Sequence, residues 1–175
     1  MKKKDGTYRC CVDYRQLNDL TVKDAYPLSR IDVCLDTLSG SCLFSSMDMK
    51  AIYHQLAVRE QDRDKTAFVT RRGLYRFRTL PFDLCNATAS FSRLACLVLS
   101  GLNFEVCLAY LDDFLVFSRT PQKHLERLEL VFQRLAQANL KLKPSKCNFF
   151  QTSIDFLGHT VSSEWIAPPR SLKPS

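Results

Sequence analysis

Short apolar runs that end at turn residues dominate the pattern of this chain. Apolar or alternating runs of about four to eight residues are typical of strands. Two pairs of neighbouring runs are close enough to form antiparallel hairpins, one joined at Arg72 and Gly73 and one meeting at Asp112 and Asp113. The predicted strands are residues 8–14, residues 42–49, a pair within residues 65–82, a pair within residues 104–118 and a hairpin within residues 147–162.

In three further segments, the apolar residues recur at helical spacing, which predicts three helices. Residues 29–38 place Ile31, Leu35 and Leu38 on one face, with Ser29 as the predicted N-cap. The other two predicted helices are one that is capped by Asn86 and stopped by Gly101, and a longer one with Pro121 in its first turn and an apolar stripe of Leu125, Leu128, Phe132 and Leu135.

Antiparallel hairpins mixed with packing helices predict the α+β class. The 175 residues suit one domain or a compact piece of a larger protein, and 46% hydrophobic residues are enough for a core. The last segment, residues 167–175, has three prolines and no apolar pattern, so we expect it to be disordered.

The net charge of +7 favours an acidic partner, and nucleic acid is the first candidate, with a merely solvated basic surface as the plain alternative. The eight cysteines form no C-x-x-C pair, which argues against a zinc site and for reduced thiols. The chain opens with no signal peptide and holds no apolar run of 18 residues. We therefore expect an intracellular protein, cytoplasmic or nuclear, with no membrane partner.

Two adjacent carboxylates interrupt the apolar segment "AYLDDFLVF" at Asp112 and Asp113. A hairpin turn is the simplest explanation, because aspartate is a favoured turn residue. The apolar flanks argue for more, since two neighbouring anions at a rigid sheet end repel each other and lose hydration. A divalent cation such as Mg²⁺ relieves both costs.

A third carboxylate, Asp48, ends the strand-like segment "CLFSSMDM". It is either an N-cap for the residues that follow or a partner of the other two carboxylates. Strands that end side by side at Asp48 and Asp112 would share a pair of Mg²⁺ ions, about 3.5–4 Å apart, suited to in-line phosphoryl transfer. The 64 intervening residues leave that pairing open.

Seven segments stand in a fixed order along the chain: "KKKDGTYRCCVDYRQLN", "YPLSRID", "FSSMDMKAIYHQL", "KTAFVTRRGLYRFRTLPF", "YLDDFLVFS", "HLERLELVFQRL" and "FLGHTVSSE". In this order and spacing, from Lys2 to about Ile166, they resemble the reverse transcriptase domain of the pol polyprotein of gypsy-like LTR retrotransposons, in a partly degenerate form. The resemblance covers nearly the whole chain and is far more specific than Y-x-D-D alone.

The resemblance implies the palm and partial fingers of a right-hand polymerase, an antiparallel sheet with packing helices, and no thumb. It implies these boundaries: partial fingers over 1–27, palm over 28–57, fingers over 58–85, palm with a primer-grip-like hairpin over 86–166, and the disordered tail over 167–175.

The implied activity is that of an RNA-directed DNA polymerase, in which a primer 3′-hydroxyl attacks the α-phosphate of a dNTP on an RNA or DNA template. By resemblance, Asp48, Asp112 and Asp113 hold two Mg²⁺ ions, for which Mn²⁺ can substitute. The implied partners are the template with its primer, the dNTP, and the thumb, connection and RNase H domains that this chain lacks.

The resemblance also assigns roles to other residues. Tyr53 matches the aromatic gate that excludes a ribose 2′-hydroxyl, although a core aromatic is its plainer explanation. Lys146 lies near the family's lysine that protonates pyrophosphate. The remaining implied residues are Lys3 and Arg9, which hold the triphosphate, Phe82, which lines the nucleotide pocket, and Phe156, Leu157 and Gly158, which position the primer end.

Several positions depart from the family pattern. Ile52 and Asp83 stand where the family has glycine, and Thr88 stands where it has proline. If the backbone at Ile52 needs a positive φ, the β-branched side chain is strained there by about 1–2 kcal/mol. We expect the Asp83 carboxylate to repel an incoming triphosphate.

These departures leave two functions open, an active polymerase domain or an inactive remnant that at most binds nucleic acid. A metal-dependent nuclease is a third class that paired carboxylates would serve. Only metal-dependent extension of a primer, rather than binding or degradation of a strand, separates the three.

Overall fold

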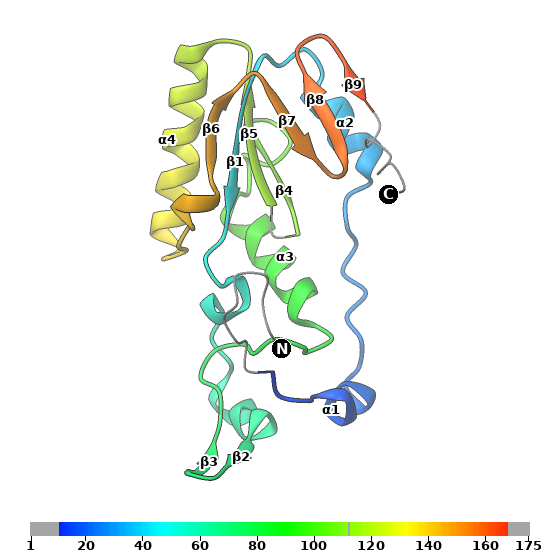
Figure 1. The fold of residues 1–175 in the computed structure, drawn as a ribbon, viewed down its shortest axis with the longest axis vertical. Helices are drawn as coiled ribbons and strands as arrows, with labels where there is room; N and C mark the ends of the chain where they lie inside the picture. Colours follow the sequence, from blue (N-terminus) through cyan, green and yellow to red (C-terminus); the bar gives the residue numbers. More distant parts are fainter. Residues whose placement is uncertain (1–10, 112, 168–175) are drawn as a thin grey trace, which may run out of the picture. The chain divides into compact units, whose positions relative to one another are not determined.

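The computed structural model describes residues 11–111 and 113–167, which contain helices and antiparallel sheets in an α+β arrangement (Figure 1). The elements are, in chain order, α1 (Arg15–Leu20), α2 (Ile31–Leu38), β1 (Leu43–Asp48), η1 (Ile52–Gln55), η2 (Glu60–Thr66), β2 (Phe68–Thr70), β3 (Gly73–Tyr75), α3 (Ala87–Val98), β4 (Cys107–Tyr110), β5 (Asp113–Ser118), α4 (Pro121–Gln137), η3 (Pro144–Lys146), β6 (Asn148–Gln151), β7 (Ser153–Phe156), β8 (His159–Ser162) and β9 (Ile166–Ala167).

The chain divides into two compact units. Residues up to Tyr26 together with Ala51–Phe91 form the first unit, and Pro27–Lys50 together with residues from Ser92 onward form the second unit. The helix α3 contributes residues to both units.

The second unit is built on a four-stranded sheet in the order β4-β5-β1-β6. The strand β1 pairs antiparallel with β5 from Leu43 opposite Ser118 to Asp48 opposite Asp113. The predicted strand at 42–49 and the predicted strand pair within 104–118 are therefore confirmed. Because side chains alternate across a strand, the even-numbered residues of β1 face one side of the sheet and the odd-numbered residues the other.

One face of this sheet packs on an apolar core with α2 and the β7–β8 hairpin. Phe44 and Leu115 of the sheet are fully buried there, together with Leu38 of α2 and Val161 of β8. Burial of such a layer supplies most of the stability of a sheet. The helix α2 begins one residue after Arg30, so the predicted N-cap at Ser29 is wrong, and Ile31 at its start is exposed.

The opposite face is covered by α4, which begins at Pro121 as predicted. Leu128 and Leu135 are buried, but Leu125 and Phe132 of the predicted stripe are exposed. The buried stripe also contains His124 and Val131. The prediction is wrong at two of its four positions, where the residue before the predicted one is buried: His124 in place of Leu125 and Val131 in place of Phe132.

The β7–β8 hairpin confirms the predicted hairpin within residues 147–162. Its two-residue turn consists of Leu157 (φ 51°) and Gly158 (φ 79°), both in the left-handed region that suits tight hairpins. The preceding strand β6 pairs with β1 instead of joining this hairpin.

The first unit has less regular structure and depends on side-chain hydrogen bonds to the backbone. The Tyr14 hydroxyl donates to the Thr66 carbonyl (3.0 Å). Asn86 Nδ2 donates to the Val22 carbonyl, and Asn86 Oδ1 accepts from the Asp24 amide. These bonds connect segments more than 50 residues apart in the sequence.

The strand predicted over residues 8–14 finds no support in its described part, because residues 11–14 form no strand and a short helix follows at Arg15. Residues 8–10 and most of the predicted disordered tail lie outside the described residues. The predicted pair within 65–82 is confirmed as the antiparallel β2–β3 hairpin.

In the described part of the chain, no helix is both long and apolar enough to span a membrane. The seven cysteines described are free thiols, and burial raises the pKa of Cys107 to about 12.

Candidate active site

The strand register of the second unit brings two of the predicted carboxylates together. Asp48 is the last residue of β1 and Asp113 the first residue of β5, and the two are direct cross-strand partners. Directly opposite residues point to the same face of a sheet, so both carboxylates lie on one side of its end. Asp112 lies outside the described residues.

The pairing of β4 with β5 sets the position of Asp113, because Tyr110 at the end of β4 is its direct cross-strand partner. Leu111 has a φ of 53°, a conformation that an L-amino acid with a side chain adopts at a cost. Such backbone strain is concentrated at functional sites.

A lysine far away in the sequence completes the charge pattern. Lys146 Nζ lies 2.7 Å from Asp48 Oδ2, although 98 residues separate them. The loop that carries Lys146 is fixed to the end of β1, because the Lys143 amide donates to the Asp48 carbonyl (2.8 Å). The short helix η3 then turns Lys146 toward the carboxylate.

This donor set suits a hard divalent cation. Like charges directly opposite on neighbouring strands destabilise a sheet, and the ion pair of Lys146 with Asp48 offsets part of that repulsion. The Asp48 side chain is 29% exposed and Asp113 is exposed, so both carboxylates are accessible to an ion. Carboxylate oxygens are the ligands that Mg²⁺ prefers. Among the residues that the structure describes, no group of three metal-ligating side chains is assembled.

Two predicted nucleotide-binding aromatics meet in the first unit. The Tyr53 and Phe82 rings pack edge to face with centroids 5.5 Å apart. The Tyr53 hydroxyl is 3.1 Å from Thr88 Oγ1, so the unexpected threonine at 88 supplies a hydrogen-bond partner. Lys3 and Arg9, the other predicted nucleotide-binding residues, lie outside the described residues.

The predicted primer-positioning residues occupy the β7–β8 turn. Phe156 is buried in the core of the second unit, Leu157 packs against that core, and Gly158 completes the turn. The buried phenylalanine therefore anchors the turn, and Leu157 and Gly158 form its tip.

Asp83 and Ile52, which stand where the family has glycine, differ in their backbone φ angles. Asp83 has a φ of 76°, as expected for a position where glycine is favoured. Ile52 lies in the short helix η1, and the positive φ of 47° belongs to its neighbour Ala51. The condition for strain at Ile52, a positive φ, is therefore not met, and the strained backbone lies one residue earlier, at Ala51.

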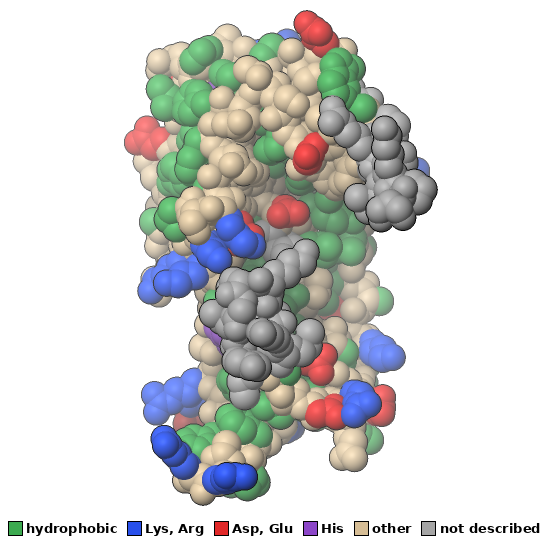
Figure 2. Space-filling view, viewed as in Figure 1, with side chains coloured by type: hydrophobic (Ala, Val, Ile, Leu, Met, Phe, Trp, Pro, Cys, Tyr) green, Lys and Arg blue, Asp and Glu red, His purple; other side chains and the backbone are tan. Residues whose placement is uncertain are grey.

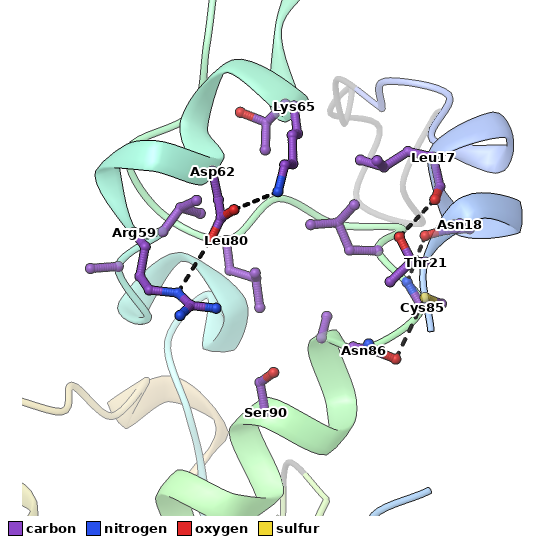
Figure 3. Close-up of a pocket in the computed structure, with 15 residues that line it drawn as sticks. Leu17, Asn18, Thr21, Arg59, Asp62, Lys65, Leu80, Cys85, Asn86 and Ser90 are labelled. Carbon is purple, nitrogen blue, oxygen red and sulfur yellow. Dashed lines mark hydrogen bonds and ion pairs between the residues drawn. The ribbon is translucent and has the colours of Figure 1, made fainter. Parts of the chain in front are cut away.

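A cavity of about 340 Å³ lies within the first unit and was not predicted from the sequence (Figure 3). Its polar wall is an ion-paired group in which Asp62 binds Lys65 (2.6 Å) and Arg59 (3.2 Å). The hydrogen bond from Lys65 keeps the pKa of Asp62 below its usual range. The opposite wall holds Asn18 and Cys85, and none of the described lining residues belongs to the predicted site.

Basic side chains gather at the end of the β2–β3 hairpin (Figure 2). Arg71 and Arg72 are exposed at its turn, and beside them Leu74 and Tyr75 are also exposed. Arginine next to exposed aromatic surface is typical of single-stranded nucleic-acid contacts.

Comparisons with known proteins agree with this geometry. The sequence profile of the family described as Reverse transcriptase (RNA-dependent DNA polymerase) matches residues 1–161. The Pol polyprotein of transposon 297 from Drosophila melanogaster is 40% identical over 95% of this chain. The Pol polyprotein of transposon gypsy from the same organism is 36% identical over 89%, and the transposon Tf2-3 polyprotein of Schizosaccharomyces pombe is 33% identical over 95%.

The chain spans only 16%, 15% and 12% of the lengths of these three relatives. Among solved structures, a foamy viral protease-reverse transcriptase in complex with double-stranded DNA matches 95% of this chain with a TM-score of 0.86 at 22% identity, covering 29% of that chain. The complex of a foamy viral protease-reverse transcriptase with an RNA/DNA hybrid matches with a TM-score of 0.84 at 22% identity, over 95% of this chain and 22% of that one. At this identity the likeness shows a shared fold.

Proposed function

Because this chain belongs to the reverse transcriptase (RNA-dependent DNA polymerase) family, we propose that it is the catalytic part of an RNA-directed DNA polymerase from a gypsy-like retrotransposon polyprotein. Its reaction is the transfer of a nucleotide from a dNTP to a primer 3′-hydroxyl on an RNA or DNA template. The observation that carries this proposal is the pairing of Asp48 with Asp113 at the end of one sheet, with Lys146 beside them.

In this proposal Asp48, Asp112 and Asp113 hold Mg²⁺, for which Mn²⁺ can substitute. When bound, the metal lowers the charge on the reacting phosphate and favours the attacking form of the hydroxyl. The accessible carboxylate pair, with both side chains on one side of the sheet end, supports this assignment.

Lys146 is the proposed proton donor to the leaving pyrophosphate. Its ammonium group lies 2.7 Å from Asp48 and is 57% exposed, so it can reach a phosphate oxygen while the carboxylate orients it. A positioned acid of this kind contributes about 10²–10⁴-fold to a rate.

We propose fingers over residues 1–27 and 58–85, nearly all of which belong to the first unit, and palm over 28–57 and 86–166, most of which belongs to the second unit. Tyr53 and Phe82 form the sugar and base side of the proposed nucleotide pocket, and their edge-to-face packing gives the Tyr53 ring one fixed orientation. A fixed ring is what discrimination against a 2′-hydroxyl requires. Lys3 and Arg9 are proposed to hold the triphosphate.

The nucleic acid is proposed to bind along basic and turn residues of both units. Arg71 and Arg72 on the β2–β3 hairpin suit a strand backbone, and the β7–β8 turn at Leu157 and Gly158, anchored by Phe156, suits the primer end. The foamy viral complexes with double-stranded DNA and with an RNA/DNA hybrid support a template–primer as the partner. The thumb, connection and RNase H domains of the polyprotein are proposed as further partners.

Primer extension tests the proposal. The chain receives a homopolymer RNA template, a DNA primer and the matching labelled dNTP with Mg²⁺. We expect extension that falls about a thousandfold in Asp48→Asn and in Asp113→Asn, the several kcal/mol that a metal ion supplies. The control Asp36→Asn removes an exposed carboxylate of α2 with the same change in net charge and should leave extension intact.

Extension that survives both site variants would refute the assignment of the carboxylates. Binding of the template–primer by the folded chain without extension would replace the polymerase by the binding remnant, and shortening of the labelled strand would replace it by a nuclease.

A further inference from the structure

A fully buried group of polar side chains lies under the α4 face of the sheet in the second unit. His124, Ser45 and Ser118 are 0%, 0% and 2% exposed. His124 Nε2 is 2.7 Å from Ser45 Oγ, and His124 Nδ1 is 2.9 Å from Ser118 Oγ. Buried polar groups are costly unless every one has a partner, so the protons of this group have a defined arrangement.

The hydrogen bonds assign the tautomer of the histidine. Ser118 Oγ donates its single proton to the Thr120 carbonyl (3.1 Å), so it accepts from His124 Nδ1. Ser45 Oγ accepts from the Phe150 amide (3.0 Å), which leaves its own proton for His124 Nε2. His124 is therefore neutral, with its proton on Nδ1, and every donor in the group has an acceptor.

The Ser45 hydroxyl thereby accepts a hydrogen bond from the Phe150 amide, which lies at an irregularity in the pairing of β1 with β6. Between the pairs Phe44–Gln151 and Ser46–Asn148, β1 has one residue and β6 has two, which is a β-bulge. Phe150 lies in the bulge with a φ of 54°, and its amide bonds the Ser45 hydroxyl. The His124 ring also packs edge to face on Phe150 with centroids 4.8 Å apart.

The bulged strand follows directly on the segment that carries Lys146. The helix η3 ends at Lys146 and β6 begins at Asn148, so the register of β6 on β1 sets where η3 docks. The docking contacts are the Lys143 amide on the Asp48 carbonyl and Lys146 Nζ on the Asp48 carboxylate.

We propose that His124 is a positioning residue of the proposed active site. As the neutral Nδ1–H tautomer it orients the Ser45 hydroxyl, which holds the bulge of β6 and so keeps Lys146 against Asp48. This inference rests on the proposed function for its meaning, but the state of His124 and the docking of η3 are measurable without catalysis.

The arrangement has a direct pH consequence. A proton on Nε2 would face the Ser45 hydroxyl proton, so one of the two donors would lose its acceptor. Burial, and secondly the Arg127 guanidinium on the same helix, lower the pKa of His124 below its usual range. The charged groups of the packed strands, Asp48 and Asp113, lie on the opposite face of the sheet, and β6 carries none.

The direction of the change in folding stability with pH follows from the lowered pKa of His124. The unfolded chain takes up the proton first, so the stability contributed by neutral His124 is complete above about pH 6.5 and falls as the pH drops below it. Each pH unit between 6.5 and the folded pKa lowers the folding equilibrium constant about tenfold. His124→Gln keeps an amide oxygen that can accept from Ser45 and should lose this dependence.

The first test is ¹⁵N NMR of the ring nitrogens in the full chain, with a pH titration. We expect the Nδ1–H tautomer at pH 7.5 and protonation of His124 at a lower pH than that of an ordinary histidine. An Nε2–H tautomer, or a titration near pH 6.5, would overturn the proposal. This measurement needs no variant and no activity.

The second test is amide hydrogen exchange in Ser45→Ala, with Ser46→Ala as the control on the opposite face of β1. We expect the Phe150 and Lys143 amides to exchange at least about tenfold faster in Ser45→Ala, the effect of one lost hydrogen bond of about 1.4 kcal/mol, and the Lys143 amide to be unchanged in Ser46→Ala. Faster exchange at Phe150 alone would show that the bulge does not position η3 and would overturn the proposal.

Primer-extension assays on the same proteins distinguish a failure of the proposed function from a failure of the proposed role of His124. A wild-type chain that does not extend a primer refutes the proposed function, while the tautomer and exchange results still decide the role of His124. In an active wild-type chain, the rate of primer extension should fall at low pH. His124→Gln should remove the part of this fall that protonation of His124 causes. An unchanged fall at low pH would contradict the positioning role.

Discussion

The two units of this chain use different means to fix their residues. In the second unit, Phe44, Leu115 and Val116 are 0% exposed in a sheet packed on both faces. In the first unit, the strands β2 and β3 are half-buried or exposed, and bonds such as Tyr14 to the Thr66 carbonyl connect distant segments.

The difference matters for the proposed chemistry. The proposed metal ligands and Lys146 lie in the unit with the layered core, where packing restricts movement to small displacements. The proposed nucleotide-binding aromatics, Tyr53 and Phe82, lie in the unit that depends on a few polar bonds. Regions of that kind open locally at low free-energy cost, which suits a part that must admit and release substrate.

The largest expected effect compares two leucines on strands. Leu115→Ala removes a fully buried side chain of β5 and should lower the free energy of unfolding by about 2–5 kcal/mol, whereas Leu74→Ala on β3, 71% exposed, should change it by less than about 0.5 kcal/mol. Urea unfolding followed by circular dichroism measures both. Equal effects would show that the first unit has a core of comparable strength.

A smaller effect is expected from the polar bonds of the first unit. Asn18 Nδ2 donates to the Asp83 carbonyl (2.7 Å), and Asn18 Oδ1 accepts from the Cys85 amide (2.8 Å). Asn18→Ala should therefore cost about 1–2 kcal/mol and speed exchange of the Cys85 amide.

The matched control is Asn148→Ala, which removes one exposed 3.3 Å bond to Ser46 Oγ in the second unit and should cost less than about 0.5 kcal/mol. Protection of the Cys85 amide that persists in Asn18→Ala would mean that packing, not this side chain, holds the loop.

The smallest expected effects have opposite signs. Asp83→Gly relieves a backbone at φ 76° and should raise the free energy of unfolding by about 0.5–1 kcal/mol. Ile52→Gly lies in η1 outside the left-handed region and should lower it by a similar amount. Thermal unfolding measures both, and a gain from Ile52→Gly would contradict the assignment of the strain to Ala51.

Much of the second unit could be predicted from the sequence, because strands that are packed on both faces appear as short apolar runs. The segments around Phe44 and Leu115 were placed correctly, and the family resemblance was confirmed by the profile match and the relatives. Two positions of the α4 stripe were wrong: His124 is buried as a hydrogen-bonded group, which an apolar count cannot detect, and Val131 is buried in place of its neighbour Phe132.

The residues of the site could be named from the sequence, but their contacts could not. The 2.7 Å contact of Lys146 with Asp48 depends on where η3 docks, and the register that places Asp48 opposite Asp113 depends on long-range pairing. In the first unit, residues 11–14 carry no strand although their alternation favours one, because tertiary hydrogen bonds such as that of Tyr14 outweigh local preference.

The most direct test of the central claim, that the paired carboxylates form a metal centre, is Mn²⁺-induced NMR line broadening in the wild-type chain and in Asp113→Asn. At low Mn²⁺ we expect the signals of residues 47–50 and 113–115 to broaden first in wild type. The variant should need more than about tenfold more Mn²⁺, whereas Asp36→Asn should behave as wild type. Broadening that is centred elsewhere, or that Asp113→Asn leaves unchanged, would contradict the claim.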